Sequence, residues 1–116
     1  MVVGAGALGN EILKNLALLG IGHIFVVDFD SIENTNLSRS VLYRQRDEGS
    51  SKAETAARAV EEINPDCRVT WINGNVAWDV GLGWFRRMDV VVGGLDNREA
   101  RLAINQACWR VGVPWV

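Results

Sequence analysis

The chain has 116 residues, of which 48% are hydrophobic and 22% charged, with a net charge of −2 and a pI near 5.3. This length fits one domain built around one core. The slight acidic excess argues against a surface that binds nucleic acid or anionic membranes, because either would need clustered lysine and arginine. Cys67 and Cys108 lie far apart, without Cys-x-x-Cys spacing or a neighbouring histidine, so neither a disulfide framework nor a zinc site is predicted.

The apolar segment at residues 16–27 is interrupted by Gly20, Gly22 and His23 and is too short to span a bilayer. No signal peptide is evident, so we expect a cytosolic (cytoplasmic) protein. The first predicted strand starts at Met1 itself, and we therefore expect the chain to be part of a longer protein.

The first motif is Gly4-x-Gly6-x-x-Gly9, which follows a short β-branched strand and precedes a helix predicted over residues 10–19. This arrangement is typical of the phosphate-binding turn of a Rossmann unit. Gly4 would make the tight turn, Gly6 would let a phosphate approach, and Gly9 would let the helix pack on the strand. The anion would bind free N–H groups at the helix start. A glycine-rich turn that binds nothing is the alternative.

A second strand is predicted over residues 23–28, and it ends in Asp28. A Rossmann fold presents a carboxylate to ribose hydroxyls about 20 residues after its glycines, and an aspartate that only caps a turn is the alternative. Residues 29–51 then form a long polar loop, and such loops in compact domains tend to be functional. Asn36 and Arg39 in this loop could reach a phosphate tail, and a solvated polar loop explains them equally well.

A capping box, Ser51-x-x-Glu54, starts a helix predicted over residues 52–63. Lys52 falls in its first turn, where the helix dipole disfavours a cation. An anionic ligand would explain this lysine, and so would the general frequency of lysine in helices.

Five more elements complete the predicted order: a strand over residues 68–73, a helix over 78–88, a strand over 89–94, a helix after Asn97, and a last strand that starts at residue 113. We predict an α/β, Rossmann-like doubly wound parallel sheet of strand order 3-2-1-4-5. Ligands of such sheets bind beyond the carboxyl ends of the strands, at the switch point. Asp96 follows the fourth strand there. A carboxylate that faces a phosphate needs a cation between them, so Asp96 is a candidate magnesium ligand.

Separated motifs cover essentially the whole chain: Gly4-Ala-Gly-Ala-Leu-Gly9, Asp28-Phe-Asp30, Asn36-Leu-Ser-Arg39, Gly49 with Lys52-Ala53, Ile63-Asn-Pro65, and Leu95-Asp-Asn97 followed by Arg101. Together they resemble the MoeB/ThiF/HesA superfamily, whose adenylation domain is shared with ubiquitin-activating enzymes. The resemblance implies that residues 1–116 are a single ATP-binding adenylation domain. In this family the C-terminal carboxylate of a ubiquitin-like or sulfur-carrier protein, on a Gly-Gly tail, attacks the α-phosphate of ATP. The products are an acyl-adenylate and pyrophosphate.

The resemblance also implies a role for each matching residue. Asp28 would hold the ribose and Asp96 a magnesium ion (Mg2+). Asn36, Arg39 and Lys52 would bind the phosphates, and the catalytic residues would be Arg39, Lys52 and Asp96. The rest of the nucleotide site would consist of Gly4, Gly6, Ala7, Gly9 and Asn97. Family members usually dimerise, so a homodimer or heterodimer is expected, with no nucleic-acid or membrane partner.

Two other interpretations stay open. A non-catalytic scaffold subunit of such an activator would share the fold, although it would have no need to keep Arg39, Lys52 and Asp96 together. An NAD-dependent oxidoreductase would explain the glycines and Asp28, and it would leave residues 36–52 unexplained.

Overall fold

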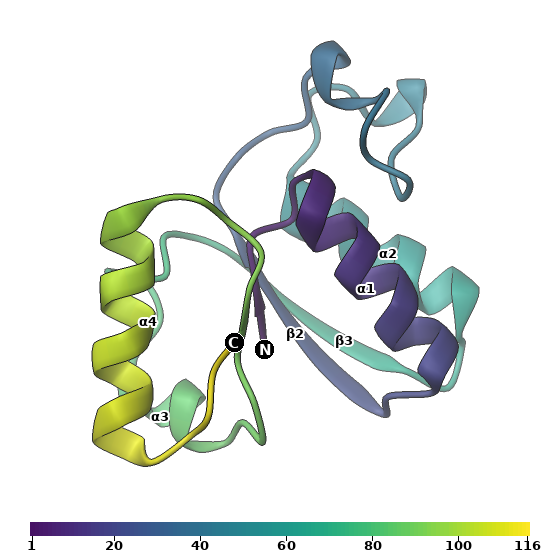
Figure 1. The fold of residues 1–116 in the computed structure, drawn as a ribbon. Helices are drawn as coiled ribbons and strands as arrows, with labels where there is room; N and C mark the ends of the chain where they lie inside the picture. The colour runs from purple at the N-terminus through teal and green to yellow at the C-terminus, as the bar shows by residue number, and fades with distance from the viewer.

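The computed structural model describes residues 1–116 and shows a parallel sheet covered by helices on both faces (Figure 1). Its strands are β1 (Val2–Val3), β2 (His23–Asp28), β3 (Arg68–Asn73) and β4 (Val92–Gly93). They lie in the order β3-β2-β1-β4, and every pair is parallel. A single parallel bridge between Val91 and Trp115 stands where a fifth strand was predicted. The α/β fold and the order of the first four strands are therefore confirmed.

The helices are α1 (Ala7–Leu19), α2 (Lys52–Ile63), α3 (Leu82–Arg86) and α4 (Arg98–Val111). The prediction for α3 was too long at both ends. Before it, the Asn75 N–H donates to Asp79 Oδ2 at 2.7 Å and forms a turn, and Gly81 caps the helix in an extended conformation. The prediction of a strand over residues 89–94 was also too long. None of the helices combines the length and the apolar character needed to cross a membrane.

The sheet divides the core into two halves. Neighbouring residues of a strand point to opposite faces, so Ile24 and Val26 of β2 pack with α1 and α2, while Phe25 and Val27 pack toward α3 and α4. Burial on both faces explains the continuous apolar run of this strand. Cys108 is buried in the second half as a free thiol.

The long loop between β2 and α2 lies beside the start of α1, at the top of Figure 1. It contains two short 3-10 turns, Asn34–Asn36 and Gln45–Asp47. An antiparallel bridge between Ser31 and Ser51 closes its base. Its apolar side chains Ile32, Leu42 and Tyr43 are buried in the core half of α1 and α2. The loop is therefore anchored to the domain, although most of its polar residues are exposed.

Candidate functional site

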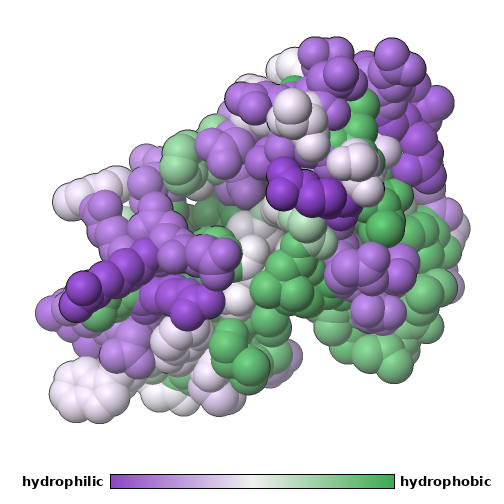
Figure 2. All heavy atoms as spheres, turned by 45° about the horizontal axis from the view of Figure 1, so that its top comes forward, coloured by the Kyte–Doolittle hydropathy of each residue, from purple (hydrophilic) through white to green (hydrophobic).

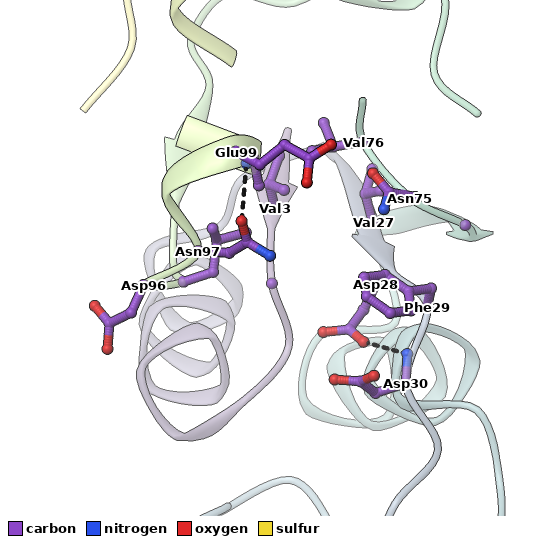
Figure 3. A pocket seen from close by; sticks show the side chains of 14 residues that line it. Val3, Val27, Asp28, Phe29, Asp30, Asn75, Val76, Asp96, Asn97 and Glu99 are labelled. Carbon is purple, nitrogen blue, oxygen red and sulfur yellow. Dashed lines mark hydrogen bonds between the residues drawn. The ribbon is translucent and has the colours of Figure 1, made fainter. Parts of the chain in front are cut away.

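A cavity of about 180 Å³ opens at the carboxyl ends of the strands. Figure 2 turns this end toward the reader and shows a hollow with apolar atoms inside and hydrophilic side chains around it. Val3, Gly4 and Val27 line its base. The end of β2 and the residues after it form one wall, and the segment between β4 and α4 forms the other together with the first turn of α4 (Figure 3): Asp28, Phe29 and Asp30 on one side, and Asp96, Asn97 and Glu99 on the other. This is the switch point of the sheet, where ligands of this fold class bind.

Asp28 is fixed by the backbone around it. Its Oδ2 accepts a hydrogen bond from the Ala5 N–H at 2.7 Å, and its Oδ1 accepts one from the Asp30 N–H at 2.7 Å. A carboxylate offers about four acceptor positions, so about one stays free on each oxygen. Two neighbouring ribose hydroxyls match this pair. Burial raises the pKa of Asp28, against the opposing effects of the two backbone hydrogen bonds and of Lys52.

The glycine turn that precedes α1 is closely packed at two positions. Gly4 has φ +98°, and a Cβ there would lie 2.8 Å from the Gly94 carbonyl oxygen. A Cβ at Gly9 would lie 1.9 Å from the Gly4 carbonyl oxygen, so Gly9 packs on the turn itself. At Gly6 a Cβ would meet no atom within 4 Å. The turn is therefore closed toward the protein and open toward a ligand, and the exposed Ala7 starts the helix beside it.

Lys52 extends the wall that carries Asp28 and Asp30. Its side chain is 12% exposed, and its Nζ lies 3.8 Å from Asp30 Oδ2. This distance exceeds the ~2.7–2.9 Å of a charge-assisted hydrogen bond. The ammonium group thus lies beside a carboxylate without a short hydrogen bond to it, and it can donate to an incoming anion. Ser51 Oγ caps α2 by accepting from the Glu54 N–H at 3.3 Å, as the capping box predicts.

Asn36 and Arg39 lie in the loop and do not line the cavity. The Asn36 Oδ1 accepts from the Glu33 N–H at 2.9 Å, which closes a short turn. Arg39 is exposed and makes no salt bridge within the chain. The structure therefore brings Gly4, Asp28, Asp96 and Asn97 to one cavity, with Lys52 at its side. It leaves phosphate binding by Asn36 and Arg39 as a prediction.

Asp96 lines the cavity, but its carboxylate points away from Asp28 and Asp30 (Figure 3). The side chain is fully exposed, and its Oδ1 lies 3.5 Å from Arg101 Nη2. No group of three or more histidine, cysteine, aspartate or glutamate side chains could hold a metal ion. Magnesium is commonly bound by one or two carboxylates together with substrate phosphates. Asp96 thus fits an ion shared with a nucleotide. Asn97 Oδ1 accepts from the Ala100 N–H at 3.2 Å and caps α4.

The charge of the cavity decides which part of a nucleotide fits it. Its lining contains four acidic residues and no lysine or arginine: Asp28, Asp30, Asp96 and Glu99. Negative walls repel phosphate, so the cavity suits an uncharged group. Its volume is also below the ~300–1,000 Å³ typical of pockets that enclose a whole ligand. The phosphates of a nucleotide would lie outside it, near the start of α1 and Lys52.

Four residues that contribute to this site were missed by the sequence predictions. Asn75 and Glu99 line the cavity, while Asn10 and Tyr43 contact the glycine turn from the protein side. Asn75 comes shortly after β3, so the strand-end rule applied to the third strand would have indicated it. No sequence pattern marks Tyr43, because its role depends on a contact with Ala5, 38 positions away.

Comparison with known proteins gives a consistent family. The ThiF family model matches residues 1–116. The SUMO-activating enzyme subunit 2 of Dictyostelium discoideum is 39% identical over 117 residues, which cover 100% of this chain and 18% of that protein. The Nedd8-activating enzyme E1 catalytic subunit of Drosophila melanogaster is 45% identical over 105 residues, with 90% and 23% covered.

The solved structures that match include the E. coli tRNA N6-threonylcarbamoyladenosine dehydratase, TcdA, in complex with ATP. It superposes with a TM-score of 0.85 at 31% identity, over 98% of this chain and 47% of that chain. The chain thus spans about a fifth of the length of these two curated relatives and about half of the solved structure. The family match over the full length and the shared fold confirm the resemblance predicted from the motifs: the chain belongs to the ThiF family.

Proposed function

We propose that this chain is the ATP-binding part of an enzyme that adenylates the C-terminal carboxylate of a ubiquitin-like or sulfur-carrier protein with a Gly-Gly tail. The observation that carries the proposal is Asp28, which has a free acceptor position on each oxygen beside an open glycine turn and Lys52. The ATP complex of TcdA and the names of the SUMO- and Nedd8-activating relatives support it.

The charges around the site give ATP an orientation. The ribose hydroxyls donate to Asp28, and the base lies in the cavity, where the walls are acidic or apolar. The phosphates extend toward the N-terminal end of α1, where free N–H groups and the helix dipole favour an anion. Lys52 lies on that side, and the loop with Asn36 and Arg39 supplies further donors to the phosphates.

The reaction is a displacement at phosphorus. A carboxylate oxygen of the carrier forms a bond to the α-phosphorus, the bond from that phosphorus to the oxygen bridging the β-phosphate breaks, and pyrophosphate leaves with the electron pair. The nucleophile is already ionised, so no general base is needed. Lys52 and Arg39 position the phosphates and offset the charge of the transition state. A magnesium ion held by Asp96 would neutralise further phosphate charge.

A carrier protein is favoured over a tRNA as the substrate. The name of TcdA specifies a modified tRNA, but that protein is 31% identical to this chain, whereas the two protein-activating relatives are 39% and 45% identical. The two relatives are also named as subunits, which supports an assembly of two chains, either a homodimer or a heterodimer.

The test is ATP–pyrophosphate exchange by the full-length protein. We expect exchange of labelled pyrophosphate into ATP that requires both Mg2+ and a carrier with an intact Gly-Gly tail. A carrier that lacks its last glycine is the matched control and should give none. Exchange that requires tRNA instead would indicate the other substrate. ATP binding without exchange would indicate a scaffold subunit, and altered nicotinamide fluorescence on mixing would indicate an oxidoreductase.

A further inference from the structure

Asn10 joins the glycine turn to the long loop from inside the protein. It lies in the first half of α1 and is 0% exposed. Its Nδ2 donates to the carbonyl oxygens of Ala5 at 2.8 Å and Gly6 at 2.9 Å, and its Oδ1 accepts from the Leu42 N–H at 2.9 Å. A single side chain thus holds two carbonyls of the turn and one amide of the loop.

Tyr43 makes a second link beside it. The ring is buried at 3% exposure, and the hydroxyl donates to the Ala5 carbonyl oxygen at 2.6 Å. The same hydroxyl lies 3.2 Å from the carbonyl oxygen of Lys52, the first residue of α2. Burial raises the pKa of Tyr43 above its ordinary value, which already lies well above neutrality, so the hydroxyl keeps its proton and stays a donor.

These bonds meet at one residue of the turn. The Ala5 N–H donates to Asp28 Oδ2, while the Ala5 carbonyl accepts from Asn10 and Tyr43. Ala5 therefore connects the carboxylate that faces the ribose, the loop that carries Asn36 and Arg39, and the start of the helix that carries Lys52. The spacing between the turn and these phosphate-side residues depends on this cluster.

We infer that Asn10 and Tyr43 are positioning residues for adenylation, and this inference rests on the proposed function. They set where the loop and Lys52 stand relative to the glycine turn, and neither lines the cavity. Every hydrogen bond that their side chains make ends on the turn, the loop or Lys52. Displacement reactions at phosphorus depend on positioning, and a misplacement of about 1 Å can lower a rate by about a hundredfold.

The first test is Tyr43→Phe in the full-length protein. This variant keeps the buried ring, and the Ala5 carbonyl keeps its bond from Asn10, so the fold is preserved. In ATP–pyrophosphate exchange we expect kcat to fall about tenfold or more, with a change of less than about twofold in the KM for ATP. Thr70→Val is the matched control. It removes a hydroxyl of β3 that lies 3.0 Å from His23 Nε2, and it should leave kcat unchanged.

The second test combines Tyr43→Phe with Arg39→Ala. If Tyr43 acts by placing the loop, the fold-loss of the double variant is smaller than the product of the single losses. A kcat of Tyr43→Phe within about twofold of the wild type, or fold-losses that multiply, would overturn the inference.

Hydrogen–deuterium exchange of the full-length protein separates this inference from the proposed function, because it needs no turnover. Tyr43→Phe is expected to speed amide exchange over residues 36–52 severalfold and to leave β3 unchanged. Unchanged exchange over residues 36–52 would contradict the inference even in an active enzyme. An inactive wild type would contradict the proposed function and would remove the catalytic role from the inference, whatever the amide exchange shows.

Discussion

Two aspartates stand on opposite walls of the same cavity and are held in opposite ways (Figure 3). Asp28 accepts two backbone hydrogen bonds, both at 2.7 Å. Asp96 is fully exposed, and its nearest cation, Arg101, is 3.5 Å away. The first carboxylate is preorganised, whereas the second can turn toward or away from the cavity at little cost. Under the proposed function, the ribose side of the site would therefore be built before ATP arrives, and the phosphate side would be completed by the ligand.

The difference follows from where each residue leaves the sheet. Asp28 is the last residue of β2, a strand that is buried on both faces and paired on both edges. Its backbone position is set by the core beneath it. Asp96 lies in the short segment between β4 and α4, where its neighbours Leu95 and Asn97 accept hydrogen bonds from α4 and its own side chain has only the 3.5 Å ion pair with Arg101. A carboxylate in such a segment is placed by what it binds.

The largest effect is expected from Asp96→Ala in the full-length protein. Pyrophosphate exchange should fall more than about a hundredfold, because the phosphates lose the carboxylate that shares their magnesium ion. The melting temperature should not change, because the side chain has no buried contact. Asp66→Ala removes another exposed aspartate, outside the cavity, and should leave exchange intact. Exchange within about threefold of the wild type in Asp96→Ala would contradict the assignment of Asp96.

The wall that carries Asp28 was largely predictable from the sequence, and the wall that carries Asp96 was predictable only in part. The position of Asp28 follows from the length of one strand–helix–strand unit, which the apolar pattern shows directly. The position of Asp96 on the rim follows in the same way, but the direction of its side chain depends on its surroundings in the folded chain, of which the structure shows Arg101. The predicted length of residues 78–88 as a helix was wrong because the turn at Asn75 and the cap at Gly81 start it later.

The contacts of Asn10 and Tyr43 were not predictable, because they join segments that are 32 and 38 positions apart. An asparagine inside a helix and a tyrosine inside a loop each have many ordinary explanations. Only the packed structure shows that both reach the glycine turn. The predicted fifth strand is reduced to the bridge between Val91 and Trp115, because the length of a strand depends on its hydrogen bonds to a neighbouring strand and not on the apolar run alone.

A smaller effect is expected from Asn10→Ala, which removes the buried side chain that holds the Ala5 and Gly6 carbonyls of the glycine turn and the Leu42 N–H of the loop. The change leaves the buried Leu42 N–H without its acceptor, so the free energy of unfolding should fall by about 1–3 kcal/mol. Asn15→Ala is the matched control, because Asn15 is exposed on the same helix and donates only to the Glu11 carbonyl. Urea unfolding of both variants measures the difference. An equal loss of unfolding free energy in the two variants would show that the buried hydrogen bonds of Asn10 do not stabilise the fold more than an exposed asparagine does.

The smallest effect concerns pH. Adenosine, which carries no phosphate, should bind more weakly as the pH falls through the pKa of Asp28, since only the ionised carboxylate keeps both acceptors. Burial raises that pKa above 3.8, so the loss begins at a higher pH than for an ordinary aspartate. The contribution of Asp28 to stability has the opposite sign, because the folded state binds this proton more tightly. It is largest at low pH and is lost as the pH rises through the folded pKa.

Calorimetric titration across this pH range is the measurement, with Asp28→Asn as the control that should bind adenosine weakly at every pH. An affinity of the wild type that stays constant down to pH 3.8 would show that the ionised form of Asp28 is not required.

The most direct test of the division between the two walls is the affinity for adenosine of the full-length wild type, Asp28→Ala and Asp96→Ala, measured by calorimetry. Loss of hydrogen bonds to a charged group costs about 1.5–3 kcal/mol, so Asp28→Ala should weaken binding by about tenfold to a hundredfold. Asp96→Ala should change it by less than about twofold. Equal losses in the two variants, or a larger loss in Asp96→Ala, would contradict the account.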